Sequence, residues 1–143
     1  MDRREMLCAL GVAAVTAGAL PSLAQTEHHH HAGSGKYQAL ADAASACSSA
    51  AEACVGHCIA MLAEGDKTLV ECAATSREVA VVCGGLRALA AQGSPHLAQY
   101  AKVAGEICKS CEAECARHPQ HPTCKACAES CAACAAECAK VAA

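Results

Sequence analysis

The spacing of the cysteines between Cys108 and Cys138 constrains the fold more than any other feature of the sequence. The chain here reads C-K-S-C-E-A-E-C, passes through a short loop rich in His and Pro, and resumes as C-K-A-C-A-E-S-C-A-A-C-A-A-E-C. Side chains three or four residues apart share one face of an α-helix. Each run therefore predicts a helix with thiols at the a and d positions of a heptad, where a helix bundle normally places Leu and Ile.

The composition favours an all-α fold. The chain of 143 residues has no Trp or Phe and only two Tyr, and it is rich in Ala. Ala has the highest helix propensity, and the scarcity of large side chains leaves little for a β-sheet to pack. The net charge of -3 and the lack of a basic stripe argue against nucleic-acid binding.

Four amphipathic segments separated by short breaks are expected after the N-terminal region. Thr68 followed by Glu71 matches a capping box, and Ser94-Pro95 places a capping residue before a proline at the first helical position. Short connections between such segments give an antiparallel up-down-up-down four-helix bundle with a cysteine-lined core. The expected helices cover residues 36–63, 66 or 68 to about 93, 94–117 and 123–141.

This topology brings the first and third connections to one end of the bundle, which we call the loop end. The helical stripes place five sulfur-bearing residues there: Cys58, Met61, Cys72, Cys115 and Cys124. Three histidines are expected close by: His57, His118 and His121. The opposite end receives Tyr37, Leu40, Leu86 and Leu97, with Cys138 as its only thiol. Gly84-Gly85 costs the second helix about 1 kcal/mol per glycine, and close approach of a neighbouring helix is the expected compensation.

Residues 1–24 are predicted to be an export signal. Arg3-Arg4 precede an apolar run over 6–20, and Ser22-Leu23-Ala24 offers a cleavage site with small residues. The twin arginine resembles a Tat signal, and a general secretory signal is the alternative. The apolar run is shorter than the about 20 residues of a transmembrane helix. We therefore expect a bacterial periplasmic protein that keeps thirteen of the fourteen cysteines.

Residues 25–35 are expected to form a disordered, His-rich tail. This segment contains His28-His29-His30-His31 followed by Ala-Gly-Ser-Gly. A purification tag directly behind an intact export signal would be unusual, so a native tail with weak metal affinity is favoured. Residues 36–143 form the four-helix domain.

Disulfide bonds are one explanation for the thiols of an exported chain. Thirteen is an odd number, so at least one thiol would remain unpaired. Cysteines three or four apart on one helix project in parallel, which suits shared ligation of a metal better than the torsion angle of a disulfide. A thiol–disulfide redox protein is a second explanation. It would need one exposed thiol of low pKa at a helix N-terminus, and Cys124 is the only such position.

Charge distinguishes among the metals that thiols bind. A zinc ion held by four thiolates leaves two negative charges per site, whereas Cu(I) at about one ion per thiolate leaves the interior neutral. Cu(I) also prefers thiolate and thioether ligands. Zinc and iron–sulfur sites remain alternatives, although finger-sized loops are absent and a continuous helix does not wrap a cluster. The predicted ligands of multiple Cu(I) ions are Cys47, Cys54, Cys58, Cys72, Cys83, Cys108, Cys111, Cys115, Cys124, Cys127, Cys131, Cys134 and Cys138.

The two cysteine runs, the segment His57-Cys58…Met61-Leu62 and the closing Glu-Cys-Ala-Lys-Val-Ala-Ala resemble the exported bacterial copper storage proteins. The resemblance covers the chain after residue 24. It implies a four-helix bundle filled with Cu(I) and assembly into homotetramers. It also implies a His and several Met residues at the open end. His57 and Met61 match two of these positions, whereas Glu64 and Leu69 stand where further methionines are expected.

We therefore predict a periplasmic protein that stores many Cu(I) ions and supplies them to a recipient copper enzyme or chaperone. It is not expected to be an enzyme, because the sequence offers no nucleophile–base pair apart from the thiols. His57 and Met61 join the thirteen cysteines as predicted ligands, while the roles of His118 and His121 are left open. A copper chaperone that delivers few ions is the alternative, and stoichiometry separates the two. No membrane partner is expected.

Overall fold

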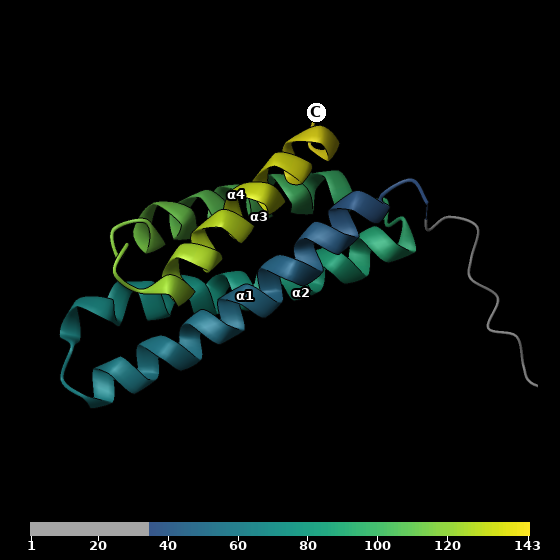
Figure 1. Ribbon diagram of the computed structural model, residues 1–143. Helices are drawn as coiled ribbons and strands as arrows, with labels where there is room; N and C mark the ends of the chain where they lie inside the picture. Colours follow the sequence, from purple (N-terminus) through teal and green to yellow (C-terminus); the bar gives the residue numbers. More distant parts are fainter. Residues whose placement is uncertain (1–34) are drawn as a thin grey trace, which may run out of the picture.

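The computed structural model describes residues 35–143 as four α-helices, with no strand in this range (Figure 1). The helices are α1 (Gln38–Ala63), α2 (Val70–Gln92), α3 (Leu97–Cys115) and α4 (Pro122–Val141), and the short 3₁₀ turn η1 (Lys67–Leu69) precedes α2. The predicted all-α fold is confirmed. The predicted signal at 1–24 and the tail up to residue 34 lie outside the described residues.

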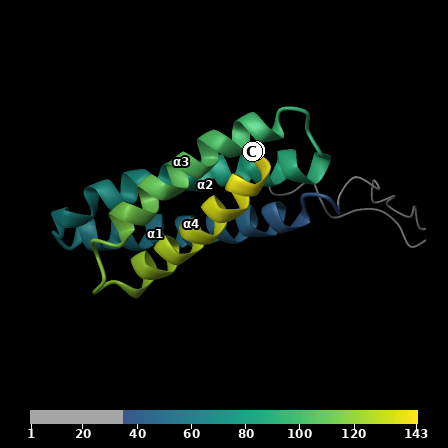
Figure 2. The same ribbon diagram turned by 90° about the horizontal axis from the view of Figure 1, so that it is seen from above.

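The four helices pack as an antiparallel bundle in which each helix contacts two neighbours. α1 and α3 both pack against α2 and α4. The α1–α2 and α3–α4 connections lie at the same end of the bundle, on the left in Figures 1 and 2, and the C-terminus lies at the other end. The loop end is therefore where the sequence placed it.

The bundle interior consists of cysteine, alanine and a few leucines. All thirteen described cysteines are buried, with side chains 0–1% exposed. Away from the loop end, Leu40, Leu86 and Leu97 form a hydrocarbon end that is also buried, and Tyr37 packs against it. Burial of such side chains stabilises the fold by about 1.5–3 kcal/mol each, so the helices can pack without metal.

The predicted capping box at the start of the second helix is wrong. Asp66 Oδ1 accepts hydrogen bonds from both the backbone N–H and the hydroxyl of Thr68, at 3.0 and 2.6 Å. The N–H of Thr68, which Glu71 would accept in a capping box, thus bonds to Asp66, and no side chain caps α2, which begins at Val70. Asp66 instead caps η1.

The third helix begins later than predicted. Ser94 Oγ accepts the N–H of His96 at 3.2 Å, and the N–H of Leu97 reaches the Ser94 carbonyl at 3.1 Å. These bonds form a turn rather than helix, so α3 starts at Leu97. The turn follows Gly93, whose positive φ of 62° ends α2.

The close approach expected at Gly84-Gly85 is confirmed for Gly85. A Cβ atom on Gly85 would lie 2.5 Å from Tyr100 Oη, whereas one on Gly84 would meet open space. Tyr100 donates its hydroxyl proton to the Val82 carbonyl at 3.2 Å. Gly85 thus leaves room for an α3 side chain that bonds to the backbone of α2.

Among the helices in the described part of the chain, α1 alone is long and apolar enough to cross a membrane, with a mean hydropathy of 1.3 over its most apolar stretch. Length and composition are weak evidence here, because core helices pass the same test. The cysteine stripe of α1 faces the other three helices.

Candidate metal centre

The thiols meet along the axis of the bundle in four groups. In each group, one sulfur per residue lies within 4.8 Å of every other. The groups are Cys54, Cys58, Cys72 and Cys124; Cys54, Cys115 and Cys127; Cys111, Cys127 and Cys131; and Cys47, Cys83, Cys108 and Cys134. Cys54 and Cys127 each belong to two groups, so three groups form a connected chain of sulfur.

The group nearest the loop end joins three helices. Cys54 Sγ on α1 lies 3.7 Å from Cys72 Sγ on α2 and 3.8 Å from Cys124 Sγ on α4. Cys58 Sγ is 4.0 Å from Cys54 Sγ, one helical turn away. The redox interpretation needed Cys124 to be exposed, but this thiol is fully buried in the group.

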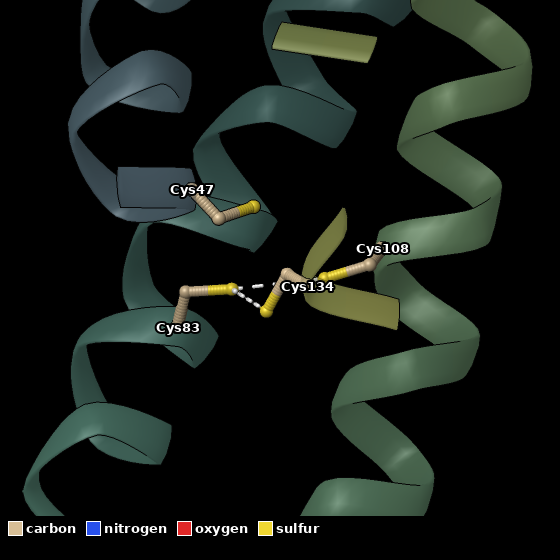
Figure 3. Close-up of side chains that lie close together, drawn as sticks. All are labelled: Cys47, Cys83, Cys108 and Cys134. Carbon is tan, nitrogen blue, oxygen red and sulfur yellow. Dashed lines mark hydrogen bonds between the residues drawn. The ribbon is translucent and has the colours of Figure 1, made fainter. Parts of the chain in front are cut away.

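Each helix contributes one thiol to the group farthest from the loop end. Cys83 Sγ lies 3.7 Å from Cys108 Sγ and 3.8 Å from Cys134 Sγ, and Cys47 completes the group (Figure 3). The heptad spacing aims the four side chains at one point on the bundle axis. All thirteen cysteines are free, and the described chain contains no disulfide.

A buried hydroxyl lies among the thiols at the middle of the bundle. Ser76 Oγ is 3.7 Å from Cys111 Sγ and 3.8 Å from both Cys115 Sγ and Cys127 Sγ. No role for Ser76 was predicted from the sequence. The sequence does contain an indication of this contact. Ser76 follows the same helical spacing as Cys72 and Cys83, so it lies on the face that carries the thiols.

Cys138 stands apart from the other twelve cysteines because it belongs to none of the four groups. It lies one helical turn beyond Cys134 on α4, against Gly105 of α3. A Cβ atom on Gly105 would lie 3.2 Å from the Cys138 Cβ.

Neighbouring thiols shift one another's pKa values in opposite directions. Hydrogen bonding with Cys108 lowers the pKa of Cys47, since a neighbouring S–H group stabilises the thiolate. Burial, followed by repulsion from Cys54, raises the pKa of both Cys58 and Cys124. The metal-free interior therefore retains many protons, and a bound metal must displace them.

Three histidines gather at the loop end. His57 Nε2 on α1 lies 3.0 Å from His121 Nδ1 in the α3–α4 loop, and His121 Nε2 lies 3.8 Å from Asp66 Oδ2. His118 is buried, with Nε2 3.2 Å from Glu114 Oε1. The structure thus brings together the histidines that the sequence placed near this end.

The predicted ligand Met61 is half-buried and packs against the core at the loop end. It belongs to none of the thiol groups, nor do the histidines. Leu69, at a position where a methionine was expected, is fully buried. The loop end thus combines imidazole nitrogen, one thioether and hydrocarbon above the first thiol group.

A helical bundle whose interior holds connected groups of free thiols defines a class of protein that binds many soft metal ions inside one domain. Within this class, the chain belongs to the copper storage protein family, whose family model matches residues 33–143. The predicted resemblance to copper storage proteins is therefore confirmed. The family and the thiol groups identify multiple Cu(I) ions as the cargo.

Solved structures with the same fold include copper storage protein 3 from Bacillus subtilis in its apo form. It is 29% identical, with a TM-score of 0.66, and the match covers 74% of this chain and 98% of that one. The Cu(I)-bound copper storage protein BsCsp3 is 30% identical, with a TM-score of 0.68, covering 76% and 100% of the two chains. No curated protein matches this chain.

Proposed function

We propose that this chain stores Cu(I) in the periplasm by loading its interior thiols, and that it supplies the ions to copper enzymes. The observation that carries the storage role is the convergence of twelve sulfurs into four groups within 4.8 Å. A metal held by three sulfurs at about 2.3 Å, a distance known from zinc thiolates, spaces those sulfurs about 4.0 Å apart. Small side-chain movements would therefore suffice for loading.

Charge favours a high copper content. Each Cu(I) that replaces a thiol proton leaves the net charge of the interior unchanged, so filling one group does not electrostatically oppose filling the next. A divalent metal at four thiolates would leave excess negative charge in a buried space, which is costly. The interior thus suits many monovalent ions rather than a few divalent ones.

We propose that copper is loaded through the loop end. His57 and Met61 lie above the first thiol group, His121 lies beside His57, and Asp66 lies beside His121. Imidazole and thioether groups bind Cu(I) more weakly than thiolates do, so an ion captured there can pass on to Cys58 and Cys54. Within the described residues, the hydrocarbon end offers only Cys138 and the single exposed histidine His96.

Export rests on the twin arginine Arg3-Arg4 and the following apolar run. Replacement of both arginines by lysine should retain the full-length protein in the cytoplasmic fraction if the Tat pathway is used. Unchanged export would indicate a general secretory signal instead. Assembly into tetramers is likewise part of the proposal, and sedimentation of the mature protein tests it.

The storage role is tested by anaerobic titration of the reduced mature protein with Cu(I) against a chromophoric chelator. Saturation at about ten or more ions, near one per thiolate, is expected. Saturation at one or two ions would instead indicate a chaperone that delivers few ions. A matched protein with all thirteen cysteines alkylated under denaturing conditions provides the baseline.

A further inference from the structure

A small surface pocket lies between α3 and α4, in the half of the bundle opposite the loop end. Its volume is about 140 Å³, and alanines and a glycine make up much of its lining. The residues that line it include Lys102, Gly105, Glu106, Lys109 and Cys138. The pocket therefore connects the surface to one member of the thiol core, in the opposite half of the bundle from the three loop-end histidines.

Cys138 is the thiol that this pocket reaches. It is 1% exposed, whereas the other twelve described cysteines are 0% exposed. It is also the cysteine outside all four thiol groups. Its side chain thus lies at the end of the sulfur column and next to the outside.

Gly105 keeps the pocket open. A Cβ atom at this position would lie 3.2 Å from the Cys138 Cβ and would occupy the wall of the pocket. Gly105 is in the interior of α3, where a glycine costs about 1 kcal/mol relative to alanine. The space beside Cys138 is therefore maintained at a cost to helix stability.

Two lysines give the rim of the pocket a positive charge. Lys102 and Lys109 line it together with the single acidic residue Glu106. Within the described chain, neither lysine lies within the 4.0 Å of a carboxylate that defines an ion pair. The exposed ammonium groups are thus free to attract an anion to the mouth of the pocket.

We propose that this pocket admits the thiol-bearing arm of a small anionic molecule, which exchanges Cu(I) with Cys138. The inference rests on the proposed storage of Cu(I). In the exchange, the incoming thiol forms a sulfur–copper bond while the bond from copper to Cys138 breaks, and the proton of the incoming thiol passes to the Cys138 thiolate. Copper remains Cu(I) throughout, so no oxidant or reductant is needed. The bundle thereby has a second route for copper, remote from the loop end.

The first test uses metal-free, reduced protein and so does not depend on copper storage. Limiting iodoacetate, an anion, and iodoacetamide, which is neutral, are compared by peptide mass spectrometry. Hydrogen bonding with Cys134 raises the pKa of Cys138, so the reaction is run at alkaline pH. Cys138 should be modified first. The double variant Lys102→Gln/Lys109→Gln should slow the iodoacetate reaction roughly threefold to tenfold and leave the iodoacetamide reaction unchanged.

Two variants serve as controls. Lys125→Gln removes an exposed lysine of α4 near the loop end and should change neither rate. Gly105→Ala should slow both reagents, because the added methyl group narrows the pocket. Earlier modification of Cys58 or Cys124, or an equal effect of the double lysine variant on iodoacetate and iodoacetamide, would overturn the proposal.

The second test follows copper. Thioglycolate, an anionic thiol, is compared with mercaptoethanol, a neutral one, for the rate at which each transfers Cu(I) from loaded protein to a chromophoric chelator. Thioglycolate should transfer Cu(I) faster than mercaptoethanol from the parent protein and from His57→Ala. In the double lysine variant this difference in rate should disappear. Loss of that advantage in His57→Ala, with the lysine variant unaffected, would place the exchange at the loop end and overturn the second route.

Discussion

Ser76 Oγ lies 3.7 Å from Cys111 Sγ, so one hydroxyl is buried inside a column that otherwise consists of thiols. The same oxygen is 3.8 Å from the sulfurs of Cys115 and Cys127. Unlike a thiol, a neutral hydroxyl is a poor ligand for Cu(I), but it donates strong hydrogen bonds to thiolates. Ser76 therefore orients and stabilises the surrounding sulfurs rather than binding copper itself.

Replacing Ser76 separates these two roles. Ser76→Ala removes the donor and should weaken binding of the ions at the middle groups by about 1 kcal/mol, roughly fivefold in affinity, at unchanged stoichiometry. Ser76→Cys adds a thiol at the same point and should raise the copper capacity by about one ion. Competition titration against a chelator measures both. Equal capacity for Ser76→Cys and the parent protein would contradict this account.

The effect of removing a cysteine should depend on how many groups it joins. Cys127 belongs to two groups, Cys83 to one, and Cys138 to none. Replacement of each by Ser should lower the copper capacity in that order, with the loss in Cys127→Ser approaching twice that in Cys83→Ser. Cys138→Ser should lose less than either. Three equal losses in the Cu(I) titration would show that the ions do not follow these groups.

The heptad spacing of the cysteines predicted most of the fold and nearly all of the thiols that meet. The spacing of residues reveals which face of a helix each one occupies. Short connections between the helices then allow only the antiparallel up-down-up-down topology. Local competition was harder to foresee, since both Asp66 and Glu71 could have bonded to Thr68, and the nearer carboxylate prevailed.

The sequence placed Cys138 as the only thiol at its end of the bundle, but its absence from every thiol group was not predictable from spacing. It continues the heptad of Cys131 and Cys134 without a break, but membership of a group depends on the axial register of neighbouring helices. That register is set by contacts between helices, such as that of Gly105 with Cys138. The periodic spacing of residues within one helix does not reveal such contacts. The pocket beside Cys138 was not predictable for the same reason, because it depends on how α3 and α4 pack in this register.

Removal of the loop-end histidine should slow loading without reducing capacity. In His57→Ala, copper loses the first nitrogen ligand above Cys58, while all thirteen thiols remain. Stopped-flow mixing with a Cu(I) complex should show slower uptake and the same final stoichiometry. His96→Ala, which alters an exposed histidine at the start of α3, is the matched control and should load normally. Unchanged uptake in His57→Ala would move the loading route elsewhere.

The metal-free protein should remain helical. Leu86 is fully buried at the hydrocarbon end, one helical turn beyond Cys83, and its side chain carries no copper ligand. Leu86→Ala should therefore lower the free energy of unfolding of the apo protein by about 2–5 kcal/mol and leave the copper capacity unchanged. Circular dichroism with denaturant measures the first quantity and Cu(I) titration the second. A random-coil spectrum for the apo parent protein would contradict a preformed bundle.

The adjacent glycines of α2 should respond oppositely to the same substitution. Gly84→Ala places its methyl group in open space and should stabilise the apo protein by up to about 1 kcal/mol through helix propensity. Gly85→Ala places it 2.5 Å from Tyr100 Oη and forces the ring away from its hydrogen bond to the Val82 carbonyl. It should be less stable than Gly84→Ala by about 1–3 kcal/mol. Tyr100→Phe removes the nearest atom, so Gly85→Ala should cost less in that background. Double-mutant analysis of the unfolding free energies tests this coupling, and additive effects would show that Gly85 is not kept for the approach of Tyr100.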